Sequence, residues 1–208
     1  LSGETVVCEK RRNPTPEQQK VLTSIREAVA SGKYAPFLLH GVTGSGKTEV
    51  YLTSVEEVLK HSREALVLVP EISLTPQLVS RFQSRFGDAI TVLHSRLSAG
   101  ERYDGWRRIK KGLVRVAIGT RSAIFAPFPR LGIIVVDEEH DTSYKQEEKL
   151  RYNARNLALV RGRMDHAVVI LGSATPSVES YFNAQTGKLT LLRLTCRVEG
   201  RPLPSIEI

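Results

Sequence analysis

The stretch Phe37-Leu38-Leu39-His40-Gly41-Val42-Thr43-Gly44-Ser45-Gly46-Lys47-Thr48 decides the fold of this chain. Its apolar start predicts a buried strand, its glycine-rich part predicts a loop, and the apolar spacing that follows over residues 50–59 predicts a helix. In that order, the spacing G-x-x-x-x-G-K-T is typical of a phosphate-binding loop. Glycines let successive amide N–H groups turn toward a phosphate chain, and the helix N-terminus adds a favourable dipole. The stretch therefore predicts a nucleotide site.

The residues of this loop have different expected roles. We expect Lys47 to reach the β- and γ-phosphates and the Thr48 hydroxyl to ligate Mg²⁺. The other loop residues that we expect to bind the nucleotide are Gly41, Thr43, Gly44, Ser45 and Gly46.

A second apolar run, residues 131–136, leads into Asp137-Glu138-Glu139-His140. In a phosphate-loop protein, an acid at the end of a buried strand holds the metal. We expect Asp137 to hold Mg²⁺ together with Thr48, and Glu138 to polarise the attacking water. Lys47, Asp137 and Glu138 are thus the expected catalytic residues. His140 has three possible roles, as a general base, a metal ligand or a hydrogen-bonding link to another loop. The link is favoured, because Glu138 already fills the role of the base and Mg²⁺ prefers oxygen ligands.

Strand and helix patterns alternate on both sides of the loop. Thr15-Pro16-Glu17-Gln18 predicts a capped helix start, with Gly32 at its end. Strands are expected at 64–70, 89–93, 114–119, 132–136, 167–171 and 189–194, and further helices at 76–86, 98–111, 156–164 and 178–184. Residues 142–156 are expected to be irregular. The alternation predicts an α/β fold, a mainly parallel sheet with helices on both faces and ligands beyond the carboxyl ends of the strands.

The composition limits the class of protein. The 208 residues are 41% apolar, enough for a packed core, and 30 Lys and Arg against 22 Asp and Glu give a net charge of +8. That excess favours a polyanionic partner, nucleic acid before membrane.

Cys8 and Cys196 do not have the spacing of metal ligands. Two thiols in a chain of this size suit a reducing cytoplasm, and the sequence does not exclude a disulfide between them. The sequence contains no run of 18 or more apolar residues, so it predicts no helix that spans a membrane. The start at Leu1 and the end at Ile208 suggest a piece of a longer chain.

Four motifs follow one another as in superfamily-two helicases: Thr15–Gln18, the loop 41–48, Asp137–His140 and Gly172–Thr175. Residues 41–51, 68–75, 119–128 and 151–155 resemble more closely the bacterial primosomal replication-restart helicases, a DEAH-type family. This resemblance spans nearly the whole chain. It implies the first RecA-like, ATP-binding lobe of a 3′→5′ DNA helicase that acts with ATP and Mg²⁺ in replication fork restart and primosome assembly.

The resemblance also implies roles for further residues. Gln18 would recognise adenine, although its role in the capping box is by itself enough to explain a glutamine at this position. Two loops would contact the backbone of single-stranded DNA. Their residues are Pro70, Glu71, Ser73, Thr75, Thr120, Arg121 and Ser122. His140, Ser173 and Thr175 would couple the ATP state to the DNA. An aromatic-rich loop would let DNA binding trigger hydrolysis, and its residues are Tyr144, Lys145, Arg151 and Tyr152. A solvated charged loop with incidental tyrosines is the alternative there.

Domains and partners follow from the same resemblance. Residues 1–13 would be a linker or the tail of a preceding region, 14–195 the helicase lobe, and 196–208 the start of a connection to a second lobe. The partners would be single-stranded and branched DNA at replication forks, other primosome proteins and single-stranded DNA-binding protein, with no membrane. The chain would be a monomer in the bacterial cytoplasm, associated with the nucleoid.

The family's N-terminal DNA-binding region, second lobe and zinc module are not among these residues, so zinc is expected only outside the chain. The second lobe carries an arginine finger that contributes about 10³–10⁵ in rate in related enzymes. We therefore expect weak nucleotide binding and very slow hydrolysis from the chain alone.

Three alternatives differ in class. A nucleotide kinase or a GTPase would need an arginine-rich lid or an N-K-x-D motif, and the sequence has neither. A binding module without catalysis is disfavoured by the intact Lys47, Thr48, Asp137 and Glu138. Another nucleic-acid-dependent ATPase, of the RNA helicase type, is the nearest rival and stays open.

Overall fold

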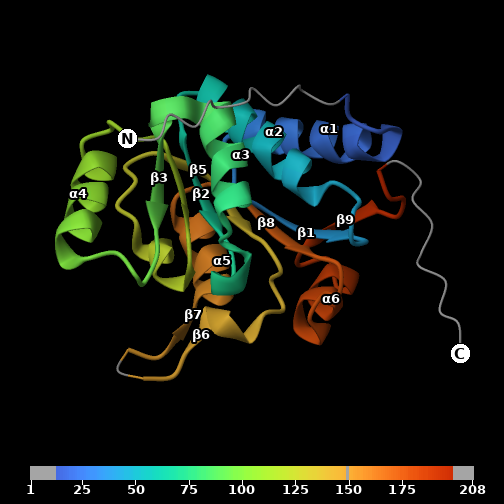
Figure 1. Cartoon of the computed structure of the whole chain (residues 1–208). Helices are drawn as coiled ribbons and strands as arrows, with labels where there is room; N and C mark the ends of the chain where they lie inside the picture. Colours follow the sequence, from blue (N-terminus) through green and yellow to red (C-terminus); the bar gives the residue numbers. More distant parts are fainter. Residues whose placement is uncertain (1–12, 149, 199–208) are drawn as a thin grey trace, which may run out of the picture.

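A parallel β-sheet forms the centre of the chain (Figure 1). The computed structural model describes residues 13–148 and 150–198. Within them the sheet has seven strands: β1 (Ala35–Gly41), β2 (Glu64–Leu68), β3 (Ile90–Leu93), β4 (Val116–Gly119), β5 (Leu131–Val136), β8 (Val168–Ser173) and β9 (Thr190–Leu194). Their spatial order is β3-β4-β2-β5-β8-β1-β9, and every neighbouring pair is parallel. The predicted α/β fold is confirmed.

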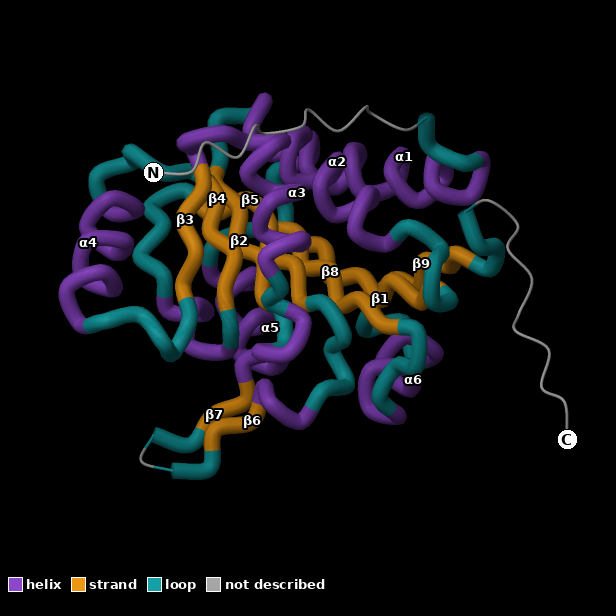
Figure 2. The backbone as a smooth tube through the Cα atoms, viewed as in Figure 1, coloured by secondary structure: helices purple, strands orange, loops and turns teal. Residues whose placement is uncertain are grey.

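Helices cover both faces of this sheet (Figure 2). They are α1 (Pro16–Ser31), α2 (Lys47–Lys60), α3 (Pro76–Phe86), α4 (Ala99–Lys110), α5 (Ala154–Met164) and α6 (Val178–Gln185). Alternate strand residues point to opposite faces, so Leu39 packs with α1 and α2 while Leu38 packs in the core on the side of α4 and α5. In the described part of the chain, no helix has the length and apolar character that crossing a membrane would require.

Local sequence signals account for the helix ends. The Thr15 side chain accepts from the backbone N–H of Gln18, and the Gln18 side chain accepts from that of Thr15, which is the predicted capping box. Ser98 and Glu101 form the same arrangement at the start of α4. Gly32 ends α1 in the left-handed conformation, with a φ of 63°.

Residues 142–156 differ from the prediction of an irregular segment. They contain a 3₁₀ turn (Thr142–Tyr144), a short antiparallel hairpin of β6 (Lys145–Gln146) and β7 (Tyr152–Asn153), and the start of α5. The helix begins earlier than predicted because the Asn153 side chain accepts from the N–H groups of Arg155 and Asn156. The expectations for residues 1–12, which include Cys8, and for 199–208 lie outside the described residues.

Candidate nucleotide site and its connections

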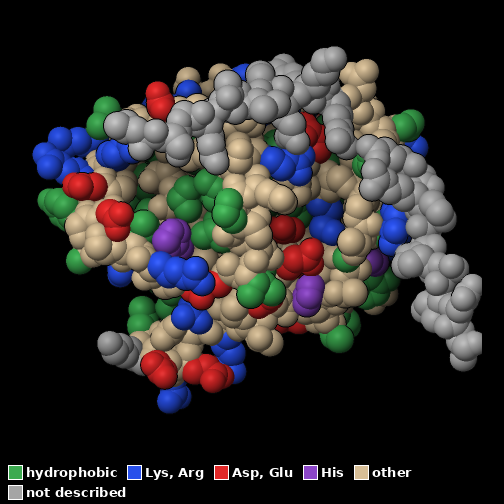
Figure 3. Space-filling model, viewed as in Figure 1, with side chains coloured by type: hydrophobic (Ala, Val, Ile, Leu, Met, Phe, Trp, Pro, Cys, Tyr) green, Lys and Arg blue, Asp and Glu red, His purple; other side chains and the backbone are tan. Residues whose placement is uncertain are grey.

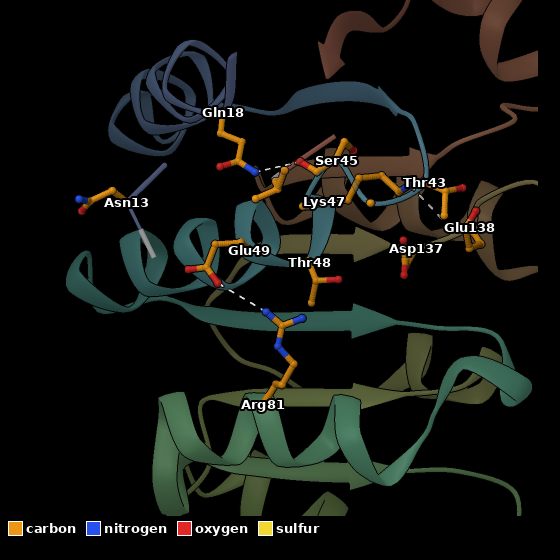
Figure 4. A pocket seen from close by; sticks show the side chains of 13 residues that line it. Asn13, Gln18, Thr43, Ser45, Lys47, Thr48, Glu49, Arg81, Asp137 and Glu138 are labelled. Atoms are coloured by element: carbon orange, nitrogen blue, oxygen red, sulfur yellow. Dashed lines mark hydrogen bonds and ion pairs between the residues drawn. The ribbon is translucent and has the colours of Figure 1, made fainter. Parts of the chain in front are cut away.

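A pocket of about 540 Å³ lies beside the glycine-rich loop between β1 and α2 (Figure 4). Most of the residues that line it were predicted from the sequence. The described lining residues are Asn13, Gln18, Thr43, Gly44, Ser45, Gly46, Lys47, Thr48, Glu49, Arg81, Asp137, Glu138 and Val198. Asn13, Glu49, Arg81 and Val198 were not anticipated. Three of the sequence motifs therefore meet at one pocket.

The loop needs glycine at two of its positions. Gly44 and Gly46 have φ values of 80° and 82°, in the left-handed region that other residues rarely adopt. A Cβ at Gly46 would also lie 2.3 Å from Gln18 Nε2. Gly46 caps α2, so the N-terminus of that helix points into the pocket.

Gln18 connects the first helix to this loop. Its Nε2 donates to the Ser45 carbonyl at 2.9 Å, and its Oε1 accepts from the Thr15 N–H at 3.0 Å. The side chain is buried. One end of the amide thus caps α1 and the other binds the loop, while the implied contact with adenine stays a prediction.

Lys47 lies between the end of β1 and the acidic motif. Its Nζ donates to the Gly41 carbonyl at 2.9 Å and lies 3.9 Å from Glu138 Oε1. The ammonium is therefore at the end of the pocket where Asp137 and Glu138 are.

Asp137 is held by a tyrosine that sequence reasoning assigned only to the apolar face of a helix. The Tyr51 hydroxyl donates to Asp137 Oδ1 at 2.9 Å. Burial raises the pKa of Asp137, the bond from Tyr51 opposes that shift, and the charge of Glu138 adds to it. Burial and the nearby Asp137 carboxylate also raise the pKa of Tyr51, which keeps the hydroxyl protonated as a donor.

The donor set fits a hard divalent cation. The Thr48 hydroxyl and the Asp137 and Glu138 carboxylates offer oxygen atoms around one pocket, and two adjacent carboxylates need a positive charge. Over residues 13–148 and 150–198, no group of three or more His, Cys, Asp or Glu could hold a metal by itself. Magnesium suits such a site, because it commonly completes its ligands with water and phosphate oxygens.

His140 forms the predicted link to another loop. Its Nδ1 is hydrogen-bonded to Ser173 Oγ at 2.8 Å, and Ser173 Oγ also accepts from the Thr175 N–H at 2.9 Å. The same Nδ1 lies 3.7 Å from Glu138 Oε2. Of the three possible roles, the geometry favours the link between the acidic motif and the end of β8.

Glu139 has a structural role that the sequence analysis missed. Its carboxylate is only 1% exposed and accepts from the Ser177 N–H at 2.6 Å, Ser177 Oγ at 3.0 Å, Ser180 Oγ at 2.8 Å and Arg155 Nη1 at 3.3 Å. Arg155 also pairs with Glu179. This cluster fastens the acidic motif to α5 and α6. The sequence did contain a signal for this role: a third acidic residue directly after the two acids of the site, behind a buried strand.

Tyr144, which the resemblance placed in an aromatic-rich loop that responds to DNA, lies in the core, and its role toward DNA stays a prediction. Tyr144 is 1% exposed, and its hydroxyl donates to the Asp137 carbonyl at 2.6 Å. Burial raises the pKa of Tyr144. The ring belongs to the core cluster that also contains residues of α5, β5 and the loop after β4.

The remaining residues expected to contact DNA divide by exposure. Glu71, Thr75, Ser122, Lys145, Arg151 and Thr175 are exposed, Ser73, Arg121 and Tyr152 are half-buried, and Pro70, Thr120 and Ser173 are buried. The exposed members are thus the candidates for side-chain contact. Arg121 Nη1 donates to the Ser143 and Lys145 carbonyls at 3.1 and 2.7 Å, so it ties the loop after β4 to the hairpin.

Comparison with known proteins agrees with this geometry. A family model described as DEAD/DEAH box helicase matches residues 15–183. The chain is 54% identical over 202 residues to the replication restart protein PriA of Bacillus subtilis, covering 96% of this chain and 25% of that protein. It is 49% identical over 183 residues to PriA of Chlamydia pneumoniae, covering 88% of this chain and 24% of that protein. The chain thus spans about a quarter of the length of these curated relatives.

Among solved structures, RecG bound to a three-way DNA junction is similar, with a TM-score of 0.70 and 25% sequence identity. The match covers 92% of this chain and 25% of that one.

Proposed function

Because this chain belongs to the DEAD/DEAH box helicase family, we propose that it is the first, ATP-hydrolysing lobe of a DNA helicase that acts in replication restart. Membership of the family implies ATP binding. One observation carries the proposal: the loop from Thr43 to Thr48 and the acids Asp137 and Glu138 line the same pocket.

The residues of the pocket divide the chemistry of hydrolysis among them. Lys47 would bind the β- and γ-phosphate oxygens, and the first turn of α2 would bind phosphate through its N–H groups. Thr48 and Asp137 would hold Mg²⁺, which when bound offsets the charge of the phosphates. Glu138 would orient the attacking water and accept its proton. Tyr51 keeps Asp137 in place through its hydroxyl.

Single-stranded DNA is the proposed substrate of the coupled movement. Exposed hydroxyl groups and cations, among them Thr75, Ser122 and Arg151, are suited to a phosphate backbone irrespective of its sequence. Figure 3 adds that Lys and Arg side chains gather over α4, which carries Arg102, Arg107, Arg108 and Lys110. Such a surface favours a polyanion.

The finer points remain proposals on the same grounds. They are 3′→5′ movement, action at forks with other primosome proteins and single-stranded DNA-binding protein, a monomeric chain in a bacterial cytoplasm, and zinc confined to other parts of the longer relatives. Residues 14–195 would form the lobe. Since the chain spans about a quarter of its relatives, we propose that it hydrolyses ATP slowly by itself and needs an arginine from a second lobe for speed.

Nucleotide and oligonucleotide binding test the proposal. Isothermal titration should detect Mg²⁺-dependent ATP binding by the chain, and Lys47→Ala should abolish it, whereas Glu138→Gln should keep binding and lose the slow hydrolysis. Single-stranded DNA should bind and raise the hydrolysis rate only slightly. ATP binding that survives Lys47→Ala would refute the assignment of the loop. A response to RNA and none to DNA would favour the RNA helicase type instead.

A further inference from the structure

Helix α4 carries cations to which no motif gives a role. Its buried residues are Gly105 and Ile109, and it packs beside β3 at one edge of the sheet (Figure 1). The other residues of the helix are exposed. The exposed cations of residues 99–111 are Arg102, Arg107, Arg108, Lys110 and Lys111, and the acids of the same stretch are Glu101 and Asp104. Five positive charges against two negative ones leave an excess of three on this helix.

Most of these cations lack a partner among residues 13–148 and 150–198. In that part of the chain, Arg107, Arg108, Lys110 and Lys111 have no side-chain hydrogen bond or ion pair, and Arg102 Nη2 donates to the Leu97 carbonyl at 3.3 Å. The negative end of the helix dipole favours cations in the last turn. However, Arg107 and Lys111 are one turn apart, and like charges at that spacing repel each other. An anionic partner would remove this repulsion.

The cations at the end of α4 lie at the edge of the sheet opposite the nucleotide pocket. The chain leaves β3 at its carboxyl end and returns through α4, so that the Arg115 N–H bonds to the carbonyl of Ala89, directly before β3, at 2.9 Å. With a rise of 1.5 Å per residue, Lys111 lies roughly 18 Å along the helix from Ala99. Charges are screened over about 8 Å at 0.15 M salt. These cations therefore contribute little to binding a single strand over the loops after β2 and β4.

Three of the cations surround one hollow on the surface. This hollow has a volume of about 470 Å³ and is lined by Asp104, Arg107, Arg108, Lys111 and Leu113. Proteins that hold a single strand combine a basic groove with aromatic rings on which the bases stack. None of these five lining residues is aromatic. A duplex presents phosphates of both strands on its outside, and cations alone are enough to bind it. The hollow is therefore suited to a duplex backbone.

We propose that α4 carries a second DNA-binding surface, in which Arg107, Arg108 and Lys111 bind backbone phosphates of a duplex arm. The inference rests on the proposed function, in which the chain acts on branched DNA and a single strand lies over the loops after β2 and β4. The two DNA segments then contact opposite edges of the same sheet. Figure 3 shows Lys and Arg side chains gathered at the α4 end of the molecule, where the duplex arm would lie.

Fluorescence anisotropy with a blunt 20-base-pair duplex and with oligo-dT separates the two surfaces. The triple variant Arg107→Gln, Arg108→Gln, Lys111→Gln should bind the duplex about tenfold more weakly at 0.1 M salt. Its slope of log affinity against log salt should be smaller by about 2–3, because each lost phosphate contact removes about 0.9. Its affinity for oligo-dT should stay within about twofold of the original.

A matched control removes the same charge elsewhere. Lys20, Lys33 and Lys188 are exposed and lie on α1, before β1 and before β9. Their combined change to Gln should leave the affinity for the duplex within about twofold, because these lysines lie outside the proposed surface. Thermal unfolding of both triple variants checks that each is folded.

Several results would overturn the proposal. They are an unchanged affinity of the α4 variant for the duplex, an equal loss of affinity for oligo-dT, and an equal loss of duplex affinity in the control. Polyglutamate that binds the original chain as tightly as the duplex, but not the α4 variant, would show a surface for acidic proteins instead. If the original chain binds neither DNA, the proposed function fails as well. If it binds oligo-dT and not the duplex, only the role of α4 is refuted.

Discussion

Glu138 and Glu139 are neighbours in the sequence with opposite surroundings, so truncating each one makes a sharp test of the structure. Glu139→Ala removes a carboxylate that is 1% exposed and accepts from Ser177, Ser180 and Arg155. Arg155 would keep Glu179, but the side chain of Glu179 is 60% exposed and gives a weaker, screened interaction. The change therefore leaves a buried guanidinium poorly compensated.

The expected cost follows from these contacts. A hydrogen bond to a charged group contributes about 1.5–3 kcal/mol, yet a simple sum over the donors overshoots because all of them share one carboxylate. Removing one partner of a buried ion pair costs about 3–5 kcal/mol. Since Glu179 still compensates Arg155 in part, we expect Glu139→Ala to lower the free energy of unfolding by about 3 kcal/mol, the lower end of this range. For a chain of this size that lowers the melting temperature by about 6–12 °C.

Urea unfolding followed by circular dichroism measures this free energy. Glu138→Ala, with a side chain that is 33% exposed, should change the free energy of unfolding by less than about 1 kcal/mol. Combining Glu139→Ala with Arg155→Met should cost less than the sum of the two single changes by at least about 1 kcal/mol. A cost of Glu139→Ala below 1 kcal/mol, an equal cost of Glu138→Ala, or strict additivity would refute the bracing role of Glu139.

Three further predictions concern the same region. Gly172→Ala should destabilise the chain by about 1–3 kcal/mol in urea unfolding, because the new Cβ would lie 1.8 Å from the Tyr51 hydroxyl, and an unchanged stability would contradict the close packing. Gln18→Ala should cost about 2 kcal/mol through the two lost bonds. Gln18→Glu should cost at least as much, because the carboxylate keeps the helix cap but is buried against the Ser45 carbonyl without a proton to donate; a cost well below that of Gln18→Ala would contradict this. Tyr144→Phe should lower the free energy of unfolding by about 1 kcal/mol through the lost bond to the Asp137 carbonyl, and leave the affinity for oligo-dT unchanged in fluorescence anisotropy; a marked loss of affinity would restore Tyr144 as a DNA contact.

The sequence predicted the elements that have strong local signals. The capping box of Thr15 and Gln18, Pro76 at the start of α3 and the apolar strands all appear where they were expected, because these signals act within a few residues. The hairpin β6–β7 was missed because strands of two residues leave no periodic pattern.

Contacts between distant parts of the chain were harder to predict. The glycine-rich loop and the acids of β5 could be placed together, since both follow parallel strands. Tyr51 and Glu139 could not, because their roles depend on which helix packs beside which strand. For Tyr144, the resemblance placed the residue in an aromatic-rich loop, and its core position appeared only with the fold.

The place of β1 in the sheet has a consequence for biosynthesis. β1 pairs only with β8 and β9 among the described strands, and 126 residues lie between Gly41 and Val168. At about 5–20 residues per second, a ribosome needs roughly 6–25 s to supply the first of these neighbours. Until then both hydrogen-bonding edges of Phe37-Leu38-Leu39 are open to pairing with other chains. Among the described strands, the one that leads into the phosphate loop is thus the one that waits longest in the growing chain for its first neighbour.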